Sequence, residues 1–184
     1  MRCTPVIATF DEKFSKQVIE IGEGLTGIVH NEDLEPHITL ADYHTLDLKT
    51  YREKLEKFTE DIECFPVEFS SVGTFPTNGT IFLAPTITRR LLALHQSFYN
   101  HFKDFHDHPQ SYYVPEKWVP HCTIANRLKR EESIRVMEFV YKGFSVQTAV
   151  VESLKLIKVN DENGNLASCN VVAEYNLKRM ELSI

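Results

Sequence analysis

The sequence predicts a bilobal α+β protein in which two antiparallel sheets with outer helices surround a central cleft. In each half of the 184 residues, β-branched runs alternate with helical periodicities in the order strand–helix–strand–helix–strand. The pattern Pro-His-x-Thr also occurs once in each half, at matching places. Together these observations indicate a diverged internal duplication with pseudo-twofold symmetry. We expect a single domain over residues 1–184, with lobes formed by residues 1–76 and 80–184.

The first half begins with a short apolar strand over residues 3–10. Asp11 is placed to cap a helix whose apolar positions recur at spacings of four, three and four. These positions are Phe14, Val18, Ile21 and Leu25. A second strand is expected over residues 37–43. Asp47 then caps a second helix, and a third strand covers residues 67–75.

The second half repeats this order. A strand over residues 80–87 is followed by a long helix that begins at Thr88. The next strand covers residues 118–125. Another amphipathic helix follows, with apolar positions at Ile134, Met137 and Val140 or Tyr141. A long strand over residues 146–159 and a last strand over residues 168–177 complete the chain.

The composition limits the classes of function. With 20 Lys and Arg against 26 Asp and Glu, the formal net charge is −6, which disfavours binding to duplex DNA through many phosphate contacts. The four cysteines include no Cys-x-x-Cys pair, so no zinc knuckle is expected. The sequence has no run of about 18 apolar residues, and Met1–Val6 lack the apolar core of a signal peptide. We expect a cytoplasmic monomer with no membrane partner.

The two copies of Pro-His-x-Thr are the strongest functional signal. They contain His37 with Thr39 and His121 with Thr123, each on the second strand of its half. In a chain of this composition, the pattern is expected by chance roughly 0.03 times. Since side chains alternate along a strand, each His shares a face with its Thr, and the residue between them points into the core. Pseudo-symmetry would bring the two polar faces together across the cleft.

Two imidazoles and two hydroxyls on facing strands suit displacement at phosphorus. Imidazole has a pKa near 6.5, so one ring can accept a proton while the other donates one. The Thr hydroxyls can donate to non-bridging phosphate oxygens. Such a site requires no metal and no other cofactor, and we expect none. The motif is symmetric, so it does not say which His is the acid.

These motifs resemble the signature of the two-histidine (2H) phosphoesterase superfamily, a pair of His-x-[Thr/Ser]-x segments on strands of a duplicated α+β fold. The likeness covers nearly the whole chain and is greatest to the LigT-like branch, the 2′-5′ RNA ligases or RNA 2′,3′-cyclic phosphodiesterases. It implies metal-independent hydrolysis of a 2′,3′-cyclic phosphate or 2′-5′ phosphodiester in an RNA end or small nucleotide. His37 and His121 would be catalytic, and Thr39 and Thr123 would bind the phosphate.

Four further residues are candidates for substrate contacts. By strand parity Arg127 shares a face with His121, so it either reaches the phosphate or is an exposed residue at the strand end. Tyr43 continues the polar face of the first motif, where it could stack on a base. Tyr113 and Trp118 precede the second motif; they either line the cleft or belong to a surface loop that Trp118 anchors.

Other readings remain open. The same cleft could belong to a non-catalytic module that binds a nucleotide or an RNA end, and the chemistry could run in reverse as 2′-5′ ligation. His101, His106 and His108 could centre a metal-dependent hydrolase, although their spacing favours a solvated helix end. A third His-x-Ser, at His95, falls on an expected helix, where the two residues do not share a face.

Overall fold

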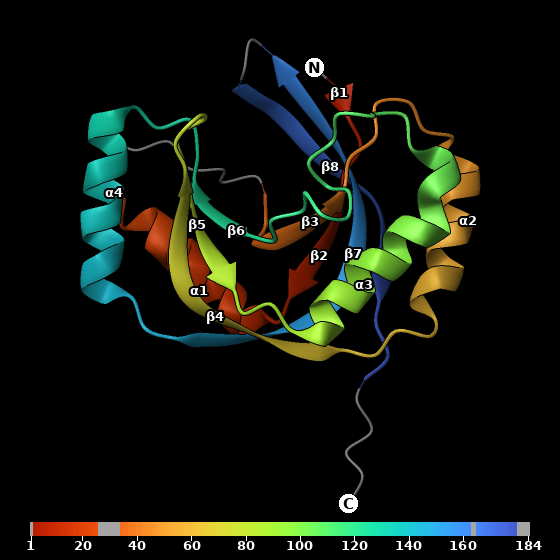
Figure 1. Ribbon diagram of the computed structural model, residues 1–184, viewed down its shortest axis with the longest axis horizontal. Coiled ribbons are helices and arrows are strands. Elements are labelled where there is room, and N and C mark those ends of the chain that lie inside the picture. The colour runs from red at the N-terminus through yellow and green to blue at the C-terminus, as the bar shows by residue number, and fades with distance from the viewer. Residues whose placement is uncertain (1, 26–33, 163–164, 180–184) are drawn as a thin grey trace, which may run out of the picture.

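The computed structural model describes residues 2–25, 34–162 and 165–179. Its helices and strands follow the predicted order (Figure 1). They are β1 (Arg2–Cys3), β2 (Val6–Phe10), α1 (Glu12–Glu23), β3 (His37–Ala41), α2 (Leu48–Thr59), β4 (Phe65–Phe75), β5 (Thr80–Pro85), α3 (Arg89–Phe102), the short 3-10 helix η1 (Lys103–Phe105), β6 (Cys122–Ala125), α4 (Arg130–Gly143), β7 (Gln147–Glu162) and β8 (Asn165–Asn176).

The predicted helix starts are present. The Asp11 side chain accepts a hydrogen bond from the backbone N–H of Phe14 at the start of α1. Asp47 and Thr88 cap α2 and α3 in the same manner. A side-chain oxygen at this position satisfies one of the backbone N–H groups that the first helical turn leaves unpaired. No helix within the described ranges is both long and apolar enough to cross a membrane.

The α+β class with helices outside the sheet is confirmed, but the strands form one sheet where the sequence suggests two. The strand order is β3-β2-β7-β4-β5-β6, and β1 and β8 also pair with β7. The sheet is continuous because the long strands β4 and β7 pair with each other, Phe65–Phe69 against Gln147–Val151. Every strand pair is antiparallel.

The strand order has the symmetry that a duplication would produce. The first half runs β2-α1-β3-α2-β4 and the second runs β5-α3-β6-α4-β7. When each strand is exchanged for its counterpart, the sheet order reads the same from either end. The helices have the same symmetry. Helix α1 of the first half packs against β6 of the second half, and its counterpart α3 packs against β3 of the first half. Each half therefore supports the motif strand of the other half.

The curvature of the sheet places the two motifs together. Strands β3 and β6 stand at opposite ends of the hydrogen-bonded order, yet they contact each other. In Figure 1 the sheet bends between two groups of helices, with α1 and α4 on one side and α2 and α3 on the other. Because a twisted sheet coils, its two ends can approach without a hydrogen-bonded ladder between them. The edges that carry the motifs thus meet near the centre of the molecule.

Candidate active site

The two motif histidines are held in the same way. The Nδ1 atom of His37 lies 2.6 Å from the carbonyl oxygen of Glu35, and the Nδ1 atom of His121 lies 2.7 Å from the carbonyl oxygen of Val119. A carbonyl oxygen accepts but cannot donate, so Nδ1 carries the hydrogen in both rings. The Nε2 atom is then a base when the ring is neutral and a donor when the ring is protonated.

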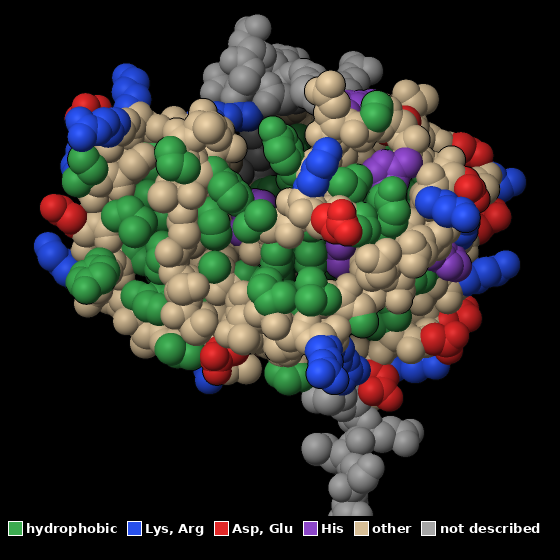
Figure 2. Space-filling view, in the orientation of Figure 1, with side chains coloured by type: hydrophobic (Ala, Val, Ile, Leu, Met, Phe, Trp, Pro, Cys, Tyr) green, Lys and Arg blue, Asp and Glu red, His purple; other side chains and the backbone are tan. Residues whose placement is uncertain are grey.

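The structure brings the two motifs together. The charge on His121 contributes to lowering the pKa of His37, an effect that requires proximity. The backbone N–H of His37 also donates to the Cys122 thiol, which belongs to the second motif. The face of the molecule seen in Figure 2 is hollowed between the side that carries α1 and α4 and the side that carries α2 and α3. Histidine and apolar side chains are visible at this hollow.

Burial is the main influence on both rings. It lowers the pKa of His37 to about 4, opposed by the hydrogen bond to Glu35 and assisted by the charge of His121. Burial also lowers the pKa of His121, opposed by the hydrogen bond to Val119. Both rings are therefore neutral at pH 7 in the absence of a ligand. A bound phosphate would favour the protonated form, because an opposite charge nearby raises the pKa of an imidazole.

Aromatic side chains surround His121. Its ring centroid lies 5.0 Å from that of Phe75 and 5.2 Å from that of Phe82. The Phe82 ring in turn occupies the space beside Gly73, where a Cβ atom would come within 2.5 Å of it. No motif in the sequence marks Gly73, Phe75 and Phe82 as neighbours of this ring or of its aromatic contacts. Their only signal is their position on either side of the turn between β4 and β5.

The two threonines have equivalent places in the two motifs, and two of the expected lining residues lie beside the first motif. Thr39 and Thr123 are half-buried, like the histidines two positions before them. The hydroxyls of Thr39 and Tyr113 are hydrogen-bonded to each other. The indole N–H of Trp118 donates to the Thr39 carbonyl oxygen at 2.9 Å. Tyr113 therefore reaches the polar face of β3. Trp118 instead contacts the backbone of β3, through the Thr39 carbonyl.

A histidine that does not belong to the motifs supports this arrangement. His95 is 3% exposed, and its ring stacks on Trp118 with centroids 3.9 Å apart. Its Nε2 atom lies 3.0 Å from the Tyr113 carbonyl oxygen. His95 is a buried packing residue on α3, in agreement with its dismissal as a third motif.

The chain matches the model of a known protein family over most of its length. The profile of the 2′-5′ RNA ligase superfamily matches residues 27–163, a range that contains both Pro-His-x-Thr segments. The chain belongs to the 2′-5′ RNA ligase superfamily. Membership of this 2H phosphoesterase group supports an enzyme that processes phosphodiesters. No curated protein sequence matches the chain significantly.

Solved structures share the fold of this superfamily member over nearly its whole length. TT0787 of Thermus thermophilus has a TM-score of 0.66 at 14% identity, covering 98% of this chain and 100% of that chain. A protein described as a phosphoesterase has a TM-score of 0.67 at 11% identity, with coverages of 97% and 99%. E. coli LigT complexed with 3′-AMP has a TM-score of 0.64 at 12% identity, with coverages of 96% and 97%.

One expected contact of the superfamily member needs correction, and strand parity does not support a second. Tyr43 is 1% exposed and its hydroxyl accepts a hydrogen bond from Tyr51, so it lies in the core and cannot stack on a base. Strand β3 ends at Ala41, so the alternation of side chains does not extend to Tyr43. Likewise β6 ends at Ala125, and Arg127 has a positive φ of 58°. Strand alternation therefore does not direct the Arg127 side chain toward the cleft.

The histidine-rich segment does not form the metal centre considered from the sequence. The His101 ring packs on Phe58 at 5.1 Å and the His106 ring on Tyr99 at 4.9 Å. Only His108 of the three belongs to a group with metal-ligand geometry among the described residues. Since the three side chains have separate surroundings, a hydrolytic metal held by all of them is excluded by this geometry.

An ion-pair network anchors the first motif and was also missed. The Lys155 ammonium lies 2.8 Å from Glu35 and 3.1 Å from Glu174. Burial lowers the pKa of Lys155, but hydrogen bonds to the two carboxylates outweigh it and raise the pKa overall. Glu35 also supplies the carbonyl that holds the His37 ring. Lys155 on β7 is thus connected to the His37 ring through Glu35.

Proposed function

We propose that the chain is a metal-independent phosphodiesterase that hydrolyses 2′,3′-cyclic phosphates, or 2′-5′ phosphodiesters, of RNA ends or small nucleotides. The observation that carries the proposal is the pair of similarly held imidazoles at the starts of two strands that contact each other, His37 as the first residue of β3 and His121 directly before β6. Both rings carry their hydrogen on Nδ1, so both Nε2 atoms are available for proton transfer. Membership of the 2′-5′ RNA ligase superfamily supports the same chemistry.

His37 is the base in this proposal. The His37 contact with its carbonyl is part-buried, whereas that of His121 is exposed. The pKa of His37 falls to about 4, so its Nε2 atom carries a lone pair over most of the pH range. His121 is more easily protonated when an anionic phosphate enters, which suits the acid.

The proposed hydrolysis moves one proton to His37 and one from His121. Water attacks phosphorus and loses a proton to Nε2 of His37, while the bond from phosphorus to one ribose oxygen breaks. Nε2–H of His121 gives its proton to that departing oxygen, so a cyclic phosphate becomes a phosphate monoester. Afterwards His37 is protonated and His121 is neutral, and exchange with solvent restores both. The same two transfers, with a 2′-5′ diester, release a free hydroxyl.

The threonines would hold the phosphate during this step. Each Thr lies two residues after the His of its motif, and both are half-buried while the residue between them is buried, so each pair shares one face. Hydroxyl donors at the non-bridging oxygens would stabilise the negative charge that develops in the transition state. The Tyr113 hydroxyl, bonded to Thr39, keeps that Thr oriented.

A small substrate suits the charge of the chain. With a net charge of −6, a long polyanion would meet overall repulsion, whereas one terminal phosphate needs only a local pocket. LigT, which shares the fold, has been crystallised with 3′-AMP, ATP and NADP+. Small nucleotides and RNA ends are therefore the substrate class we propose.

The test is hydrolysis of the four 2′,3′-cyclic nucleotides and a 2′-5′ dinucleotide in the presence of EDTA. The wild type should release monophosphate, and His37→Ala or His121→Ala should each reduce kcat/KM by about 10²–10⁴. His101→Ala is the matched control, because that ring lies on Phe58 outside the motifs. Saturable binding without product would favour the binding module, and full activity in both motif variants would reject the proposal.

A further inference from the structure

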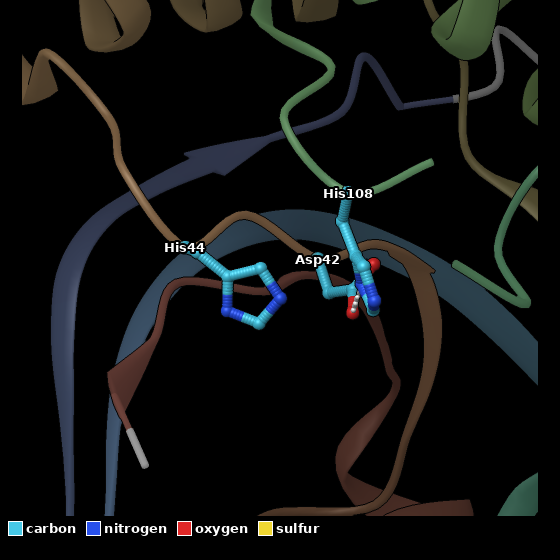
Figure 3. A group of neighbouring side chains, drawn as sticks. All are labelled: Asp42, His44 and His108. Carbon is cyan, nitrogen blue, oxygen red and sulfur yellow. Dashed lines mark hydrogen bonds and ion pairs between the residues drawn. The ribbon is translucent and has the colours of Figure 1, made fainter. Parts of the chain in front are cut away.

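Three side chains outside the motifs converge where two loops meet. Asp42 and His44 follow β3, and His108 follows η1, 64 residues or more along the chain. Figure 3 shows these side chains approaching one another from the two segments. One ligand atom from each lies within 4.8 Å of the others. The proposed phosphodiester chemistry does not use any of the three.

Asp42 and His108 are already placed as ligands of a small ion would be. His108 Nδ1 lies 3.2 Å from one carboxylate oxygen of Asp42. In a tetrahedral zinc site with bonds of about 2.0–2.2 Å, neighbouring ligand atoms are about 3.3–3.5 Å apart. The contact therefore matches one edge of such a site. The His108 side chain is 30% exposed and the Asp42 side chain is 18% exposed, so an ion could reach them from solvent.

His44 completes the group from the exposed side. Its ring centroid lies 4.5 Å from that of His108, and its side chain is exposed. A small rotation of the ring can bring a nitrogen to the distance that a shared ion requires. Its backbone is fixed, because its N–H donates to both oxygens of the Asp107 carboxylate at 3.1 and 3.0 Å.

A second layer of hydrogen bonds orients the carboxylate. Ser111 is 1% exposed, and its hydroxyl donates to the other oxygen of Asp42 at 2.6 Å. The same Ser111 oxygen accepts from the backbone N–H of Tyr113 at 3.0 Å. Hydrogen-bonded carboxylates of this kind are typical of protein metal sites, where the outer layer fixes the ligands. Through Ser111, the group is connected to the segment that reaches Thr39.

We propose that Asp42, His44 and His108 bind one divalent transition-metal ion of the Zn²⁺ class. Two imidazoles and one carboxylate are ligands that Zn²⁺ prefers, whereas Mg²⁺ and Ca²⁺ require more oxygen atoms. The fourth position is open to water. The ion would join the loop after β3 to the segment before β6, and so hold Tyr113 beside the cleft. The proposal does not depend on the proposed function.

The test is calorimetric titration of the EDTA-treated full chain with Zn²⁺ alone. The wild type should bind one ion per chain, and His44→Ala, Asp42→Asn and His108→Ala should each weaken binding at least tenfold. Ser111→Ala should weaken it by about tenfold, since it disturbs only the orientation of Asp42. His101→Ala, another histidine of the same region, should leave the affinity unchanged.

Thermal unfolding separates binding from misfolding. At 100 times the dissociation constant, Zn²⁺ should raise the wild-type Tm by about 5–10 °C, and it should not raise that of the His44→Ala/His108→Ala double variant. In EDTA the two proteins should unfold at similar temperatures. Equal Zn²⁺ affinity in the wild type and the double variant would overturn the proposal. An equal loss of affinity in His101→Ala would overturn it as well.

Discussion

His37 and His121 occupy equivalent positions in the two halves, but their surroundings differ. Each ring donates from Nδ1 to the carbonyl two residues earlier. Around His37 the supports are polar: an ion pair from Lys155 to Glu35 holds the segment that bears the ring. Around His121 they are aromatic, and the ring packs against the Phe75 and Phe82 side chains.

This difference gives the two copies of one motif different pKa values. The shared hydrogen bond fixes the same tautomer in both rings, so the motif alone would make them equivalent. Burial then separates them, because the pKa of His37 falls to about 4 while that of His121 falls less. We infer that the environment, rather than the motif, makes His37 the base and His121 the acid.

The pH dependence of kcat/KM should show the largest effect of this asymmetry. Activity requires neutral His37 and protonated His121, so it should decline below about pH 4 and above a pKa that lies under 6.5. The maximum should fall between these values, with about a tenfold loss per pH unit on the alkaline side. The kcat profile should be displaced to higher pH, because the bound phosphate raises both pKa values.

Initial rates measured from pH 3.5 to pH 9 check this prediction. Ionic strength should be held constant, since screening alters the interaction of both rings with the phosphate. A kcat/KM maximum above pH 7 would contradict the lowered pKa values in the free protein.

Substitution of Thr39 and Thr123 tests whether the two motifs contribute equally to binding the substrate phosphate. Thr39→Val and Thr123→Val keep the side-chain shape but each removes the proposed hydrogen bond from the hydroxyl to the substrate phosphate. A hydrogen bond to a charged group is worth about 1.5–3 kcal/mol. Each should therefore reduce kcat/KM by about 10–100-fold. Thr148→Val, at an exposed position of β7, is the control. Unchanged rates in both motif variants would remove the threonines from the site.

Lys155 tests the polar support of His37. Lys155→Met would leave Glu35 without its ammonium partner and allow the carbonyl that holds the ring to shift. We expect kcat to fall by about tenfold with little change in KM, because misplacing a catalytic group affects the chemical step more than binding. Lys155→Arg should restore part of the rate. A loss confined to thermal stability, with normal kcat, would show that Lys155 does not position His37.

Gly73 tests the aromatic support of His121 and should have the smallest effect. In Gly73→Ala the new Cβ atom would meet the Phe82 ring at 2.5 Å, and that ring would move against His121. We expect about a threefold to tenfold fall in kcat/KM together with a modest loss of stability. Gly143→Ala is the control, since nothing lies within 4 Å of its added Cβ atom. Identical kinetics in the two variants would rule out this support.

Signals in the sequence predicted the order of helices and strands and the proximity of the two Pro-His-x-Thr motifs. Asp11 and Thr88 mark the starts of α1 and α3 because a helix cap depends on residues within one turn. The repeated Pro-His-x-Thr marked the two edge strands. Tyr43 was misplaced because alternation holds only while the strand continues, and β3 ends at Ala41.

The supports of the site were beyond sequence reasoning because they join distant parts of the chain. Lys155 and Glu35 are 120 residues apart, and an ion pair leaves no local pattern at either position. Asp42 and His108 are separated by 66 residues, so the spacing of His101, His106 and His108 could not show that His108 lies beside Asp42. Such contacts follow from the sheet curvature, which no single motif specifies.

The most direct test of the division of roles changes the leaving group. A 4-nitrophenyl ester of thymidine 3′-phosphate releases an oxygen that needs no proton, whereas a 2′,3′-cyclic phosphate releases one that does. The account predicts that His121→Ala recovers most of its lost kcat/KM on the aryl ester, while His37→Ala stays about 10²–10⁴-fold below the wild type on both substrates. Recovery of His37→Ala instead, or equal losses for both variants on both substrates, would contradict it.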